Sequence, residues 1–425
     1  MKKLILSAVL LGGACLTQAQ TEEIVSMGAS YENDQWYSLE NGIVATENAS
    51  NWDIAFQIGG LAEAGIRINE AKGVEIYHYG DIEDWDDVID VSTLTLEPLH
   101  NSVISWTEGA LIQLGANDPF DYGWGSYEMA AHAVVGTRAF ILKLADGTYK
   151  KLKIEGLVQG SIYQVYLADL DGSNEINPAL DKDDYRNGTE EPVYVYYNVE
   201  NDEYLDRESV ASTAWDFLFT QFKDMAEHPF IPGTFEMSTV TGLLSNPNIE
   251  VAQVDEVADV DGLYEWTGQN YITDINVIGH DWKHHVPQVG FEFVEDRVYF
   301  VKTEAGDIWK VVMTGFGGNS TGDYEFTKEK ISTLSIAEND INKPEMIVYP
   351  NPANSNVSLI LNNLNASEVN VSIVNTTGQV VYTKDLVGNN KFEVKNISVA
   401  HLNAGVYMVN VNTGSQHVTQ RLIIQ

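Results

Sequence analysis

Short runs of β-branched and aromatic residues, bounded by Gly, Asp or Asn, recur along the chain after its first twenty positions. Runs of this kind predict β-strands, which we expect at 141–144, 151–154, 298–302 and 309–313. Amphipathic helical periodicity is scarce, and Val210–Asp224 is the best candidate for a helix. The hydrophobic pattern therefore predicts an all-β protein.

Two segments of this strand-rich region return later in the chain, in the same order. The hexapeptide Asn51–Phe56, which contains Trp-Asp, returns as Ala214–Phe219. The strand-like run Arg138–Lys143 returns as Arg297–Lys302, with the same spacing to the Gly and Lys that follow it. Two markers in one order indicate an internal duplication.

Each copy is long enough to bury its own core, so the repeat predicts two tandem domains rather than a solenoid. We place these β domains at 20–180 and 193–335, with an acidic linker at 181–192. Within the copies, 143–151 and 302–310 predict β-hairpins whose turns use Gly for its positive φ.

The repeated Trp-Asp pair has two interpretations. It is a buried strand end, whose indole fills the core while the carboxylate accepts a backbone hydrogen bond, or it belongs to a ligand site. The structural interpretation is the simpler one. We expect it for Trp52-Asp53 and for Trp215-Asp216.

The segment Asp169–Pro192 is acidic and rich in turn-forming residues, which is typical of a solvated linker. A calcium site is the alternative, because hard oxygen ligands at alternate positions suit that ion. Its ligands would be Asp169, Asp171, Ser173 and Glu175. However, Gly172 is the fourth residue of this segment, where an EF-hand loop needs Gly at the sixth, which favours the linker.

A change in composition follows Ser332: 336–345 is a polar linker, and 346–425 is rich in Asn and Val. Short strands at the spacing of an Ig-like β-sandwich are expected in this last region. They are Val357–Leu361, Val369–Val374, Gln379–Leu386, Phe392–Ile397, Gly405–Asn410 and Val418–Ile424.

The first nineteen residues predict a signal peptide: two lysines, an apolar run and a small-residue cleavage site that ends at Ala19. The single cysteine, Cys15, lies within it and gives an alternative, a lipoprotein signal in which that cysteine is acylated. With no other cysteine, disulfides and zinc-thiolate sites are excluded.

Charge excludes one class of partner. The 425 residues carry 62 Asp plus Glu against 24 Lys plus Arg, a formal net charge of -38. Phosphate backbones are bound by neutralising them with Lys and Arg, so nucleic acid is not an expected partner. After the signal there is no apolar run of transmembrane length.

The last region carries a recognisable pattern. It consists of Tyr349-Pro-Asn-Pro352, Asn375–Gly378, Leu402–Tyr407 and the terminal Arg421-Leu-Ile-Ile. In these motifs the region resembles the C-terminal sorting domain of type IX secretion cargo. The resemblance implies export, interaction with the type IX secretion machinery, and release or attachment at the cell surface.

A second resemblance rests on the repeats, at Trp52–Phe56, Asp296–Lys302 and Gly306–Lys310, the last followed by Gly315-Phe316. These segments are similar to those of the HmuY-like family of secreted haem-binding proteins. The resemblance spans most of 31–332 and implies an all-β fold that binds haem without catalysis. The family's axial ligands come from the middle of the repeat, where the match is weak.

Haem is held by two imidazoles, or by His with Met, one on each face of an apolar slot. By position, His284 or His285 falls near the second family ligand, and His132 is the candidate in the first repeat. The remaining histidines of the two repeats are unmatched: His78, His100, His228 and His280.

Two features limit these candidates. His284 and His285 point to opposite faces of a strand, so only one can line a given pocket, and the pattern favours an exposed, solvated pair over a ligand role. Methionines are more often core filler than ligands, and we expect that role for Met129, Met225 and Met237.

Together these features predict a secreted or cell-surface, non-enzymatic binding protein with two HmuY-like β domains and a sorting β-sandwich. Its expected ligand is haem or a haemoprotein. The alternative is a cofactor-free adhesion or scaffold module that binds glycan or protein. No hydrolase signature stands out: neither H-E-x-x-H nor a phosphate-binding loop occurs.

Overall fold

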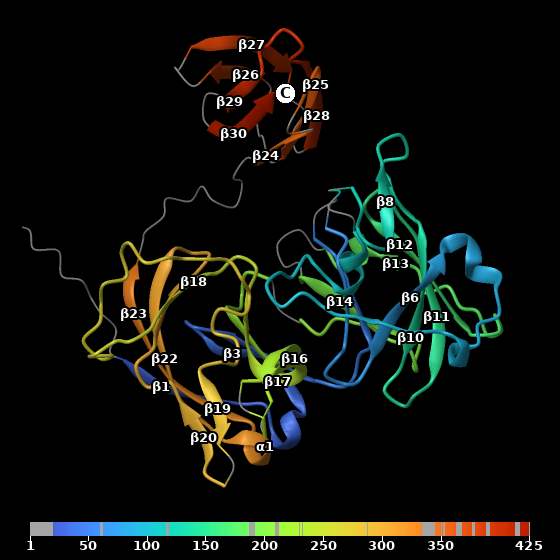
Figure 1. Ribbon diagram of the computed structural model, residues 1–425. Helices are drawn as coiled ribbons and strands as arrows, with labels where there is room; N and C mark the ends of the chain where they lie inside the picture. The colour runs from blue at the N-terminus through green and yellow to red at the C-terminus, as the bar shows by residue number, and fades with distance from the viewer. Residues whose placement is uncertain are drawn as a thin grey trace, which may run out of the picture. The chain divides into compact units, whose positions relative to one another are not determined.

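A computed structural model gives the fold (Figure 1), which divides into a unit of Met1–Leu334 and a unit of Ser335–Gln425. The residues it describes are 20–59, 63–115, 118, 120–186, 192–208, 212–228, 230–231, 233–286, 288–333, 345–349, 351, 353–362, 368–375, 379–387, 392–412 and 417–424. The predicted signal peptide, with Cys15, lies outside these residues, as does nearly all of the linker predicted at 336–345.

The first unit contains two β lobes, each built from two sheets around its own hydrophobic core. Lobe 1 is formed by residues 54–205. Its smaller sheet has the order β15 (Glu203–Leu205), β14 (Tyr194–Asn198), β4 (Ile54–Gln57), β5 (Ile66–Ile68). Its larger sheet has the order β13 (Leu180–Asp181), β12 (Ile162–Asp169), β11 (Tyr149–Val158), β10 (Arg138–Lys143), β6 (Glu75–Asp81), β7 (Pro98–Leu99), with β8 (Gly125–Glu128) and β9 (Ala133–Gly136) added through β11.

Lobe 2 is formed by two stretches of chain, 21–48 and 217–333. One sheet has the order β1 (Thr21–Ser26), β23 (Asp323–Thr333), β22 (Asp307–Phe316), β21 (Val298–Lys302), β18 (Glu250–Val254). The other has the order β17 (Phe235–Ser245), β16 (Phe217–Glu227), β2 (Asn33–Ser38), β3 (Gly42–Asn48), and a separate hairpin consists of β19 (Lys283–Val286) and β20 (Gly290–Phe293).

Short helical turns connect these strands. The only α-helical segment within the described residues is α1 (Gly318–Thr321). The 3-10 turns are η1 (Ala29–Tyr31), η2 (Ile82–Asp86), η3 (Val91–Thr93), η4 (Ala110–Leu114) and η5 (Lys182–Asp184). The predicted all-β class is confirmed, and strands cover every run that the hydrophobic pattern marked in 141–154 and 298–313.

The lobes do not follow the domain boundaries expected at 180 and 193. Strands β1 to β3 come from the first expected domain, yet β1 pairs with β23 and β2 with β16 (Figure 1). Conversely, β14 from the second expected domain pairs with β4. The hairpin of β2 and β3 therefore joins the sheet of β16, the strand that follows Trp215-Asp216. The hairpin of β14 and β15 joins the sheet of β4, the strand that follows Trp52-Asp53. A repeat in sequence marks equivalent segments, but it does not specify which copy they pair with.

The two Trp-Asp segments have matching surroundings. The backbone N–H of Asp53 donates to Tyr197 O at 2.9 Å, and that of Asp216 to Tyr37 O at 2.8 Å. The Asp53 carboxylate accepts from Val199 N at 2.9 Å, and that of Asp216 from Leu39 N at 2.6 Å. Asp53 is buried and Asp216 is half-buried, and each carboxylate secures the turn of the hairpin beside it. The backbone hydrogen bonds expected of the carboxylates are present in both segments, and Trp215 is buried, but Trp52 is only half-buried and lines a pocket.

The helix expected at Val210–Asp224 is wrong for its described part, because Phe217–Glu227 forms strand β16. Phe217 and Phe219 enter the core of lobe 2, whereas Leu218 and Phe222 pack in a second cluster on the opposite face. A strand buried on both faces has a continuous apolar run without period-two alternation, which local periodicity does not separate from a helix.

The acidic segment expected to be a solvated linker is partly built into lobe 1. Lys182 is fully buried and its Nζ donates to Glu63 O at 2.7 Å, while Asp181 pairs with Ile162. The calcium alternative finds no support: Asn174 Nδ2 donates to Asp169, and Trp85 Nε1 donates to Glu175. No metal-binding group of three His, Cys, Asp or Glu side chains occurs among the described residues.

The second unit is a small sandwich around one core. One sheet has the order β24 (Glu345–Tyr349), β25 (Asn356–Asn362), β28 (Phe392–Ser398); the other has the order β27 (Val380–Val387), β26 (Glu368–Asn375), β29 (Gly405–Asn412), β30 (His417–Ile424). All six expected strands are present, and β24 is an additional one. The motif Asn375–Gly378 lies outside the described residues except for Asn375. In the described part of the chain, no helix has the length and apolar character needed to cross a membrane.

Candidate functional site

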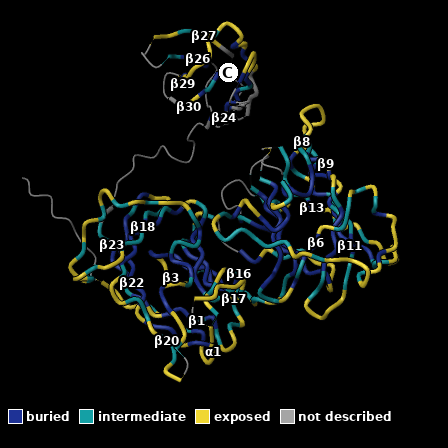
Figure 2. Tube along the Cα trace, in the orientation of Figure 1, coloured by how far each residue is buried: buried dark blue, intermediate teal, exposed yellow. Residues whose placement is uncertain are grey.

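The three histidines proposed as haem ligands lie on two hairpins in different lobes. His132 is exposed in the turn between β8 and β9, in a loop that is exposed in Figure 2. His284 and His285 are exposed on β19. Their cross-strand partners are Glu292 and Phe291, so they face opposite sides of the hairpin, as expected. The structure does not bring His132 together with the pair on β19.

The other histidines of the two lobes have local partners. His100 Nδ1 lies 2.7 Å from Glu70 Oε1, and His280 Nε2 lies 3.5 Å from Asp224 Oδ2. His78 contacts its neighbouring backbone, and His228 lies against Phe230.

The methionines expected in the core are instead exposed: Met129, Met225 and Met237. Met225 and Met237 form a cross-strand pair on β16 and β17, two strands that extend beyond the region where β2 covers them. The expectation of core filler is therefore wrong for all three: Met225 and Met237 lie where β16 and β17 extend past β2, and Met129 lies in the exposed turn after β8.

One sequence pattern was overlooked in expecting no hydrolase signature. Gly318–Gly322 matches G-x-S-x-G, the motif of a nucleophile elbow. In the structure Ser320 is exposed on α1, and its Oγ donates to Gly317 O at 2.9 Å. An activated serine instead donates to a base such as an imidazole, so the observed hydrogen bond marks the segment as a turn between β22 and β23.

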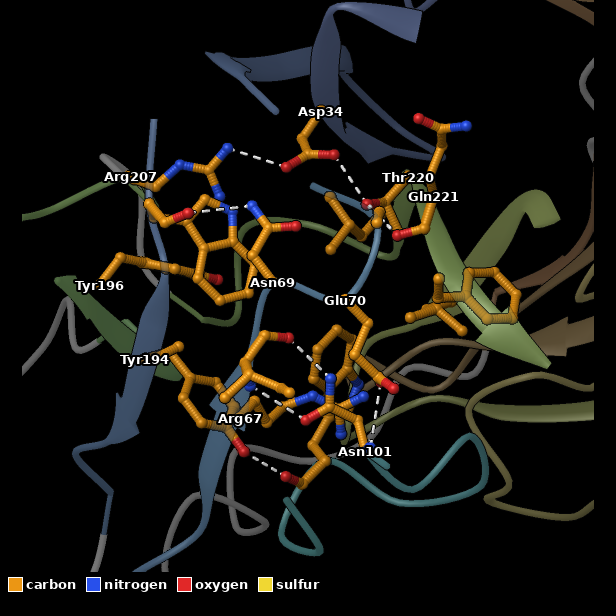
Figure 3. Close-up of a pocket in the computed structure, with 18 residues that line it drawn as sticks. Asp34, Arg67, Asn69, Glu70, Asn101, Tyr194, Tyr196, Arg207, Thr220 and Gln221 are labelled. Carbon is orange, nitrogen blue, oxygen red and sulfur yellow. Dashed lines mark hydrogen bonds and ion pairs between the residues drawn. The ribbon is translucent and has the colours of Figure 1, made fainter. Parts of the chain in front are cut away.

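The most developed site is a pocket where the two lobes meet (Figure 3). Lobe 1 contributes Trp52, Arg67 from β5, Tyr194 and Tyr196 from β14, and the loop that carries Trp106. Lobe 2 contributes residues of β2, β16 and β17: Asp34, Leu218, Thr220, Gln221, Phe222 and Leu244. Aromatic rings and charged groups are thus brought together from segments far apart in the sequence.

Arg207 is the central charged group of this pocket. It is only 1 % exposed and follows β15 on the segment that leads out of lobe 1. Its Nη2 donates to Asp34 Oδ2 at 2.8 Å (Figure 3) and also to Asn48 O at 2.9 Å. Its guanidinium also lies over the ring of Tyr196, 4.9 Å from the centroid. A buried guanidinium needs such a carboxylate and ring faces to offset its lost hydration.

The neighbouring residue, Glu208, forms hydrogen bonds with the strand that carries Tyr194 and Tyr196. Its fully buried carboxylate accepts hydrogen bonds from Val193 N at 2.8 Å, Tyr194 N at 3.2 Å and Tyr196 Oη at 3.0 Å. Burial raises the pKa of Glu208 to about 7, while these three hydrogen bonds act in the opposite direction. This carboxyl group therefore adds to the pairing of β14 with β4 and β15 in holding that strand in the pocket wall.

Arg67 and Trp106 join the lobes at the other side of the pocket. Arg67 donates to Ser105 O at 3.0 Å and Ser102 O at 2.9 Å, and its guanidinium lies 5.1 Å from the ring centroid of Trp106. Trp106 Nε1 in turn donates to Ser245 O of lobe 2 at 2.7 Å. The loop is thus fixed to both lobes, which makes the pocket a preformed feature.

Two donors on the pocket wall lack a partner. Within the described residues, Trp52 Nε1 and Arg207 Nε are buried and form no hydrogen bond. The cavity beside them has a volume of about 60 Å³. That volume admits a few water molecules or the edge of a larger ligand. It is far below the roughly 300–1,000 Å³ of a site that encloses a whole small molecule, so a porphyrin does not fit here.

The sequence contained two signals for this pocket. Trp52 was singled out as half of a repeated pair, but the repeat itself favoured a structural role. Arg207 stands between two acidic residues in a chain with few basic ones, which is unusual enough to indicate a specific partner. Neither signal predicted the pocket, because its lining combines separate segments between Asp34 and Leu244 that only the fold brings together.

Comparisons with known proteins cover the chain unevenly. No curated protein matches it. Among solved structures, it is similar to the dimeric latent PorU from Porphyromonas gingivalis, at 10% identity and a TM-score of 0.17, with 95% of this chain and 34% of that chain covered. It is also similar to the BSP domain of a biofilm associated protein, at 8% identity and a TM-score of 0.17, with 96% and 81% covered.

These TM-scores are too low to support any inference about fold or function, and the chain spans only about a third of the PorU structure, 34%. The informative match is to a family model, the secretion system C-terminal sorting domain, over residues 347–425. That range coincides with the described β-sandwich of the second unit. The chain therefore ends in a type IX secretion sorting domain, and the protein is exported to the cell surface or the extracellular medium.

Proposed function

We propose that the exported protein is a non-enzymatic, cofactor-free adhesion module that binds an extracellular ligand in the pocket between its two lobes. One observation carries this proposal: a buried arginine, one N–H of which has no hydrogen-bond partner among the described residues, lies among the aromatic rings that line a cavity. Burying a polar group without a partner is unfavourable by about 1–3 kcal/mol, so a ligand that supplied the missing acceptor would be stabilised by it.

Haem capture stays a prediction, together with the HmuY-like resemblance on which it rests. The recurrence of the Asp53 and Asp216 hydrogen bonds supports the duplication part of that resemblance. The ligand part has less support, because His132, His284 and His285 are all exposed and lie on hairpins of different lobes. We therefore place adhesion first and haem second.

The test blocks the pocket. Ala71 is half-buried and lines it, so Ala71→Trp should fill its opening. Ala226, half-buried on β16 outside the lining, gives the matched control Ala226→Trp. Mature protein and both variants would be passed over immobilised neutral glycans, acidic glycans and matrix proteins, and each would be titrated with haemin.

The proposal expects at least one immobilised probe to retain the wild type and Ala226→Trp but not Ala71→Trp, and haemin to keep the spectrum of free haemin. Equal retention of all three proteins, or of none, would overturn it. So would a Soret shift that is lost only on combined His284→Ala and His285→Ala substitution, which would establish haem capture instead.

A further inference from the structure

The polar groups of the pocket restrict the chemistry of its ligand. Trp52 Nε1–H and Arg207 Nε–H are both donors, both buried and both without a partner among the described residues. Each requires an acceptor atom, and an oxygen is the common one. A ligand with two nearby oxygens would complete both groups at once.

The charges of the pocket favour a neutral ligand. Two cations, Arg67 and Arg207, are balanced by two carboxylates, Asp34 and Glu70. Arg207 is already paired with Asp34, and Arg67 with two backbone carbonyls. The chain as a whole carries a net charge of -38, which opposes the approach of an anion. The charged side chains that line the pocket therefore carry no net formal charge.

The aromatic rings add a second requirement. Trp52, Trp106, Tyr194 and Tyr196 line the same pocket, and Trp52 and Tyr196 meet edge to face, with centroids 5.0 Å apart. Rings of this kind pack against apolar C–H groups, while their N–H and O–H edges bond polar atoms. Hydroxyl oxygens next to a C–H face describe a sugar ring.

We infer that the pocket binds a neutral sugar unit of an extracellular glycan, with hydroxyl oxygens accepting from Trp52 Nε1–H and Arg207 Nε–H. This inference rests on the proposed function and names its ligand class. Because the cavity holds only about 60 Å³, one edge of the sugar enters and the rest of the glycan stays in solvent. Each hydroxyl can also donate a hydrogen bond, and the carboxylates of Asp34 and Glu70 on the pocket lining are acceptors for it.

Substitution of Trp52 by Phe tests the donor while keeping an aromatic ring. A matched control exists: Trp282 Nε1 is also buried and unpartnered among the described residues, but Trp282 lies in the core of lobe 2 and not on the pocket. The mature protein, Trp52→Phe and Trp282→Phe would be titrated calorimetrically with glucose, galactose, mannose and fucose, and with glucuronic acid and inorganic phosphate. Loss of a hydrogen bond to a bound hydroxyl should weaken binding about tenfold.

A second measurement uses the unaltered protein, so that it does not depend on how the variants fold. Indole N–H resonances would be followed by NMR during the same titrations, with Trp52 assigned from the spectrum of Trp52→Phe. We expect a neutral sugar to shift the Trp52 signal and leave that of Trp282 in place. Absence of any shift with all four sugars would overturn the inference, as would tighter binding of glucuronic acid or phosphate.

The outcomes separate the two proposals. If Ala71→Trp abolishes retention on an immobilised protein but no sugar binds, the pocket is functional and only the ligand class is wrong. If neither blocking the pocket nor adding sugar has an effect, both proposals fail.

Discussion

The two lobes hold equivalent hairpins with equivalent aspartates, but the two carboxylates have different surroundings. Asp53 of lobe 1 forms an ion pair with Lys72, at 2.6 Å from its Nζ. For Asp216 of lobe 2, burial raises the pKa to about 6, although the N–H of Leu39 acts in the opposite direction. The same turn is therefore stabilised by a cation in one lobe, and mainly by backbone hydrogen bonding in the other.

The lobes also differ in how the chain supplies their strands. Lobe 1 is built from one continuous stretch, 54–205, whereas lobe 2 combines 21–48 with 217–333. Closing lobe 2 requires pairing of β1 with β23 across most of the unit, and long loops increase the entropy lost on closure. The folding of lobe 2 therefore depends on the N-terminal strands and that of lobe 1 does not, although the Trp-Asp hydrogen bonds of the two lobes match.

The largest effect should come from removing residues 20–48 of the mature chain. This deletion removes β1 to β3 and five side chains buried in or beside the core of lobe 2: Val25, Met27, Trp36, Tyr37 and Leu39. At about 1.5–3 kcal/mol each, their loss approaches or exceeds the roughly 5–15 kcal/mol that stabilises a whole domain. Hydrogen exchange should show β16 to β23 unprotected and β4 to β12 still protected.

Deletion of 335–425 is the control for that experiment, because this segment is a separate unit. It should leave the protection of both lobes unchanged. If the shorter chain without 20–48 still protected β16 and β23, lobe 2 would not depend on the N-terminal strands, and the contrast between the lobes would disappear.

Substituting the two aspartates one at a time should have smaller effects on the free energy of unfolding, and the two effects should differ. Asp216→Asn keeps an acceptor for the N–H of Leu39 and removes a desolvated charge, so the free energy of unfolding at pH 7 should be unchanged or higher. Asp53→Asn leaves the ammonium of Lys72 without its carboxylate and should lower the free energy of unfolding by about 1–3 kcal/mol. Urea unfolding, followed by fluorescence, measures both.

The ionisation of Asp216 should make the stability of the protein depend on pH. The pKa of Asp216 in the folded state, about 6, is above its ordinary value of 3.8, so the folded state binds this proton more tightly than the unfolded state. Its contribution to stability is complete below pH 3.8 and is lost as pH rises through about 6. Asp216→Asn should therefore lack part of the decline in stability that the wild type shows between pH 4 and 7; parallel curves would contradict this.

The smallest effect concerns the exposed hairpins of the two lobes. His132→Ala in lobe 1, and His284→Ala with His285→Ala in lobe 2, should each change the free energy of unfolding by no more than about 0.5 kcal/mol. His284 lies 3.4 Å from Glu292, but both side chains are more than half exposed, and such pairs contribute little. A larger loss in one lobe only, measured by urea unfolding, would show that its hairpin has contacts that the other lacks.

Much of the local structure was predictable. The strands at 141–154, at 298–313 and throughout the second unit follow from β-branched runs between turn residues, and the role of Asp53 and Asp216 follows from their burial beside a hairpin. The helix expected at Val210–Asp224 failed because β16 is buried on both faces, a property that depends on what packs against it. The exposure of Met225 and Met237 likewise depends on where β2 ends.

The sequence alone determined the β class, the C-terminal sorting domain and the positions of the repeated Trp-Asp turns, because each depends on residues close together in the chain. Tertiary structure decided which hairpin completes which sheet, and it created the pocket around Arg207 from both lobes. Hydrophobic periodicity encodes which face of a strand is buried, but it does not encode the partner. The pairing depends on the summed burial and hydrogen bonding of the whole unit.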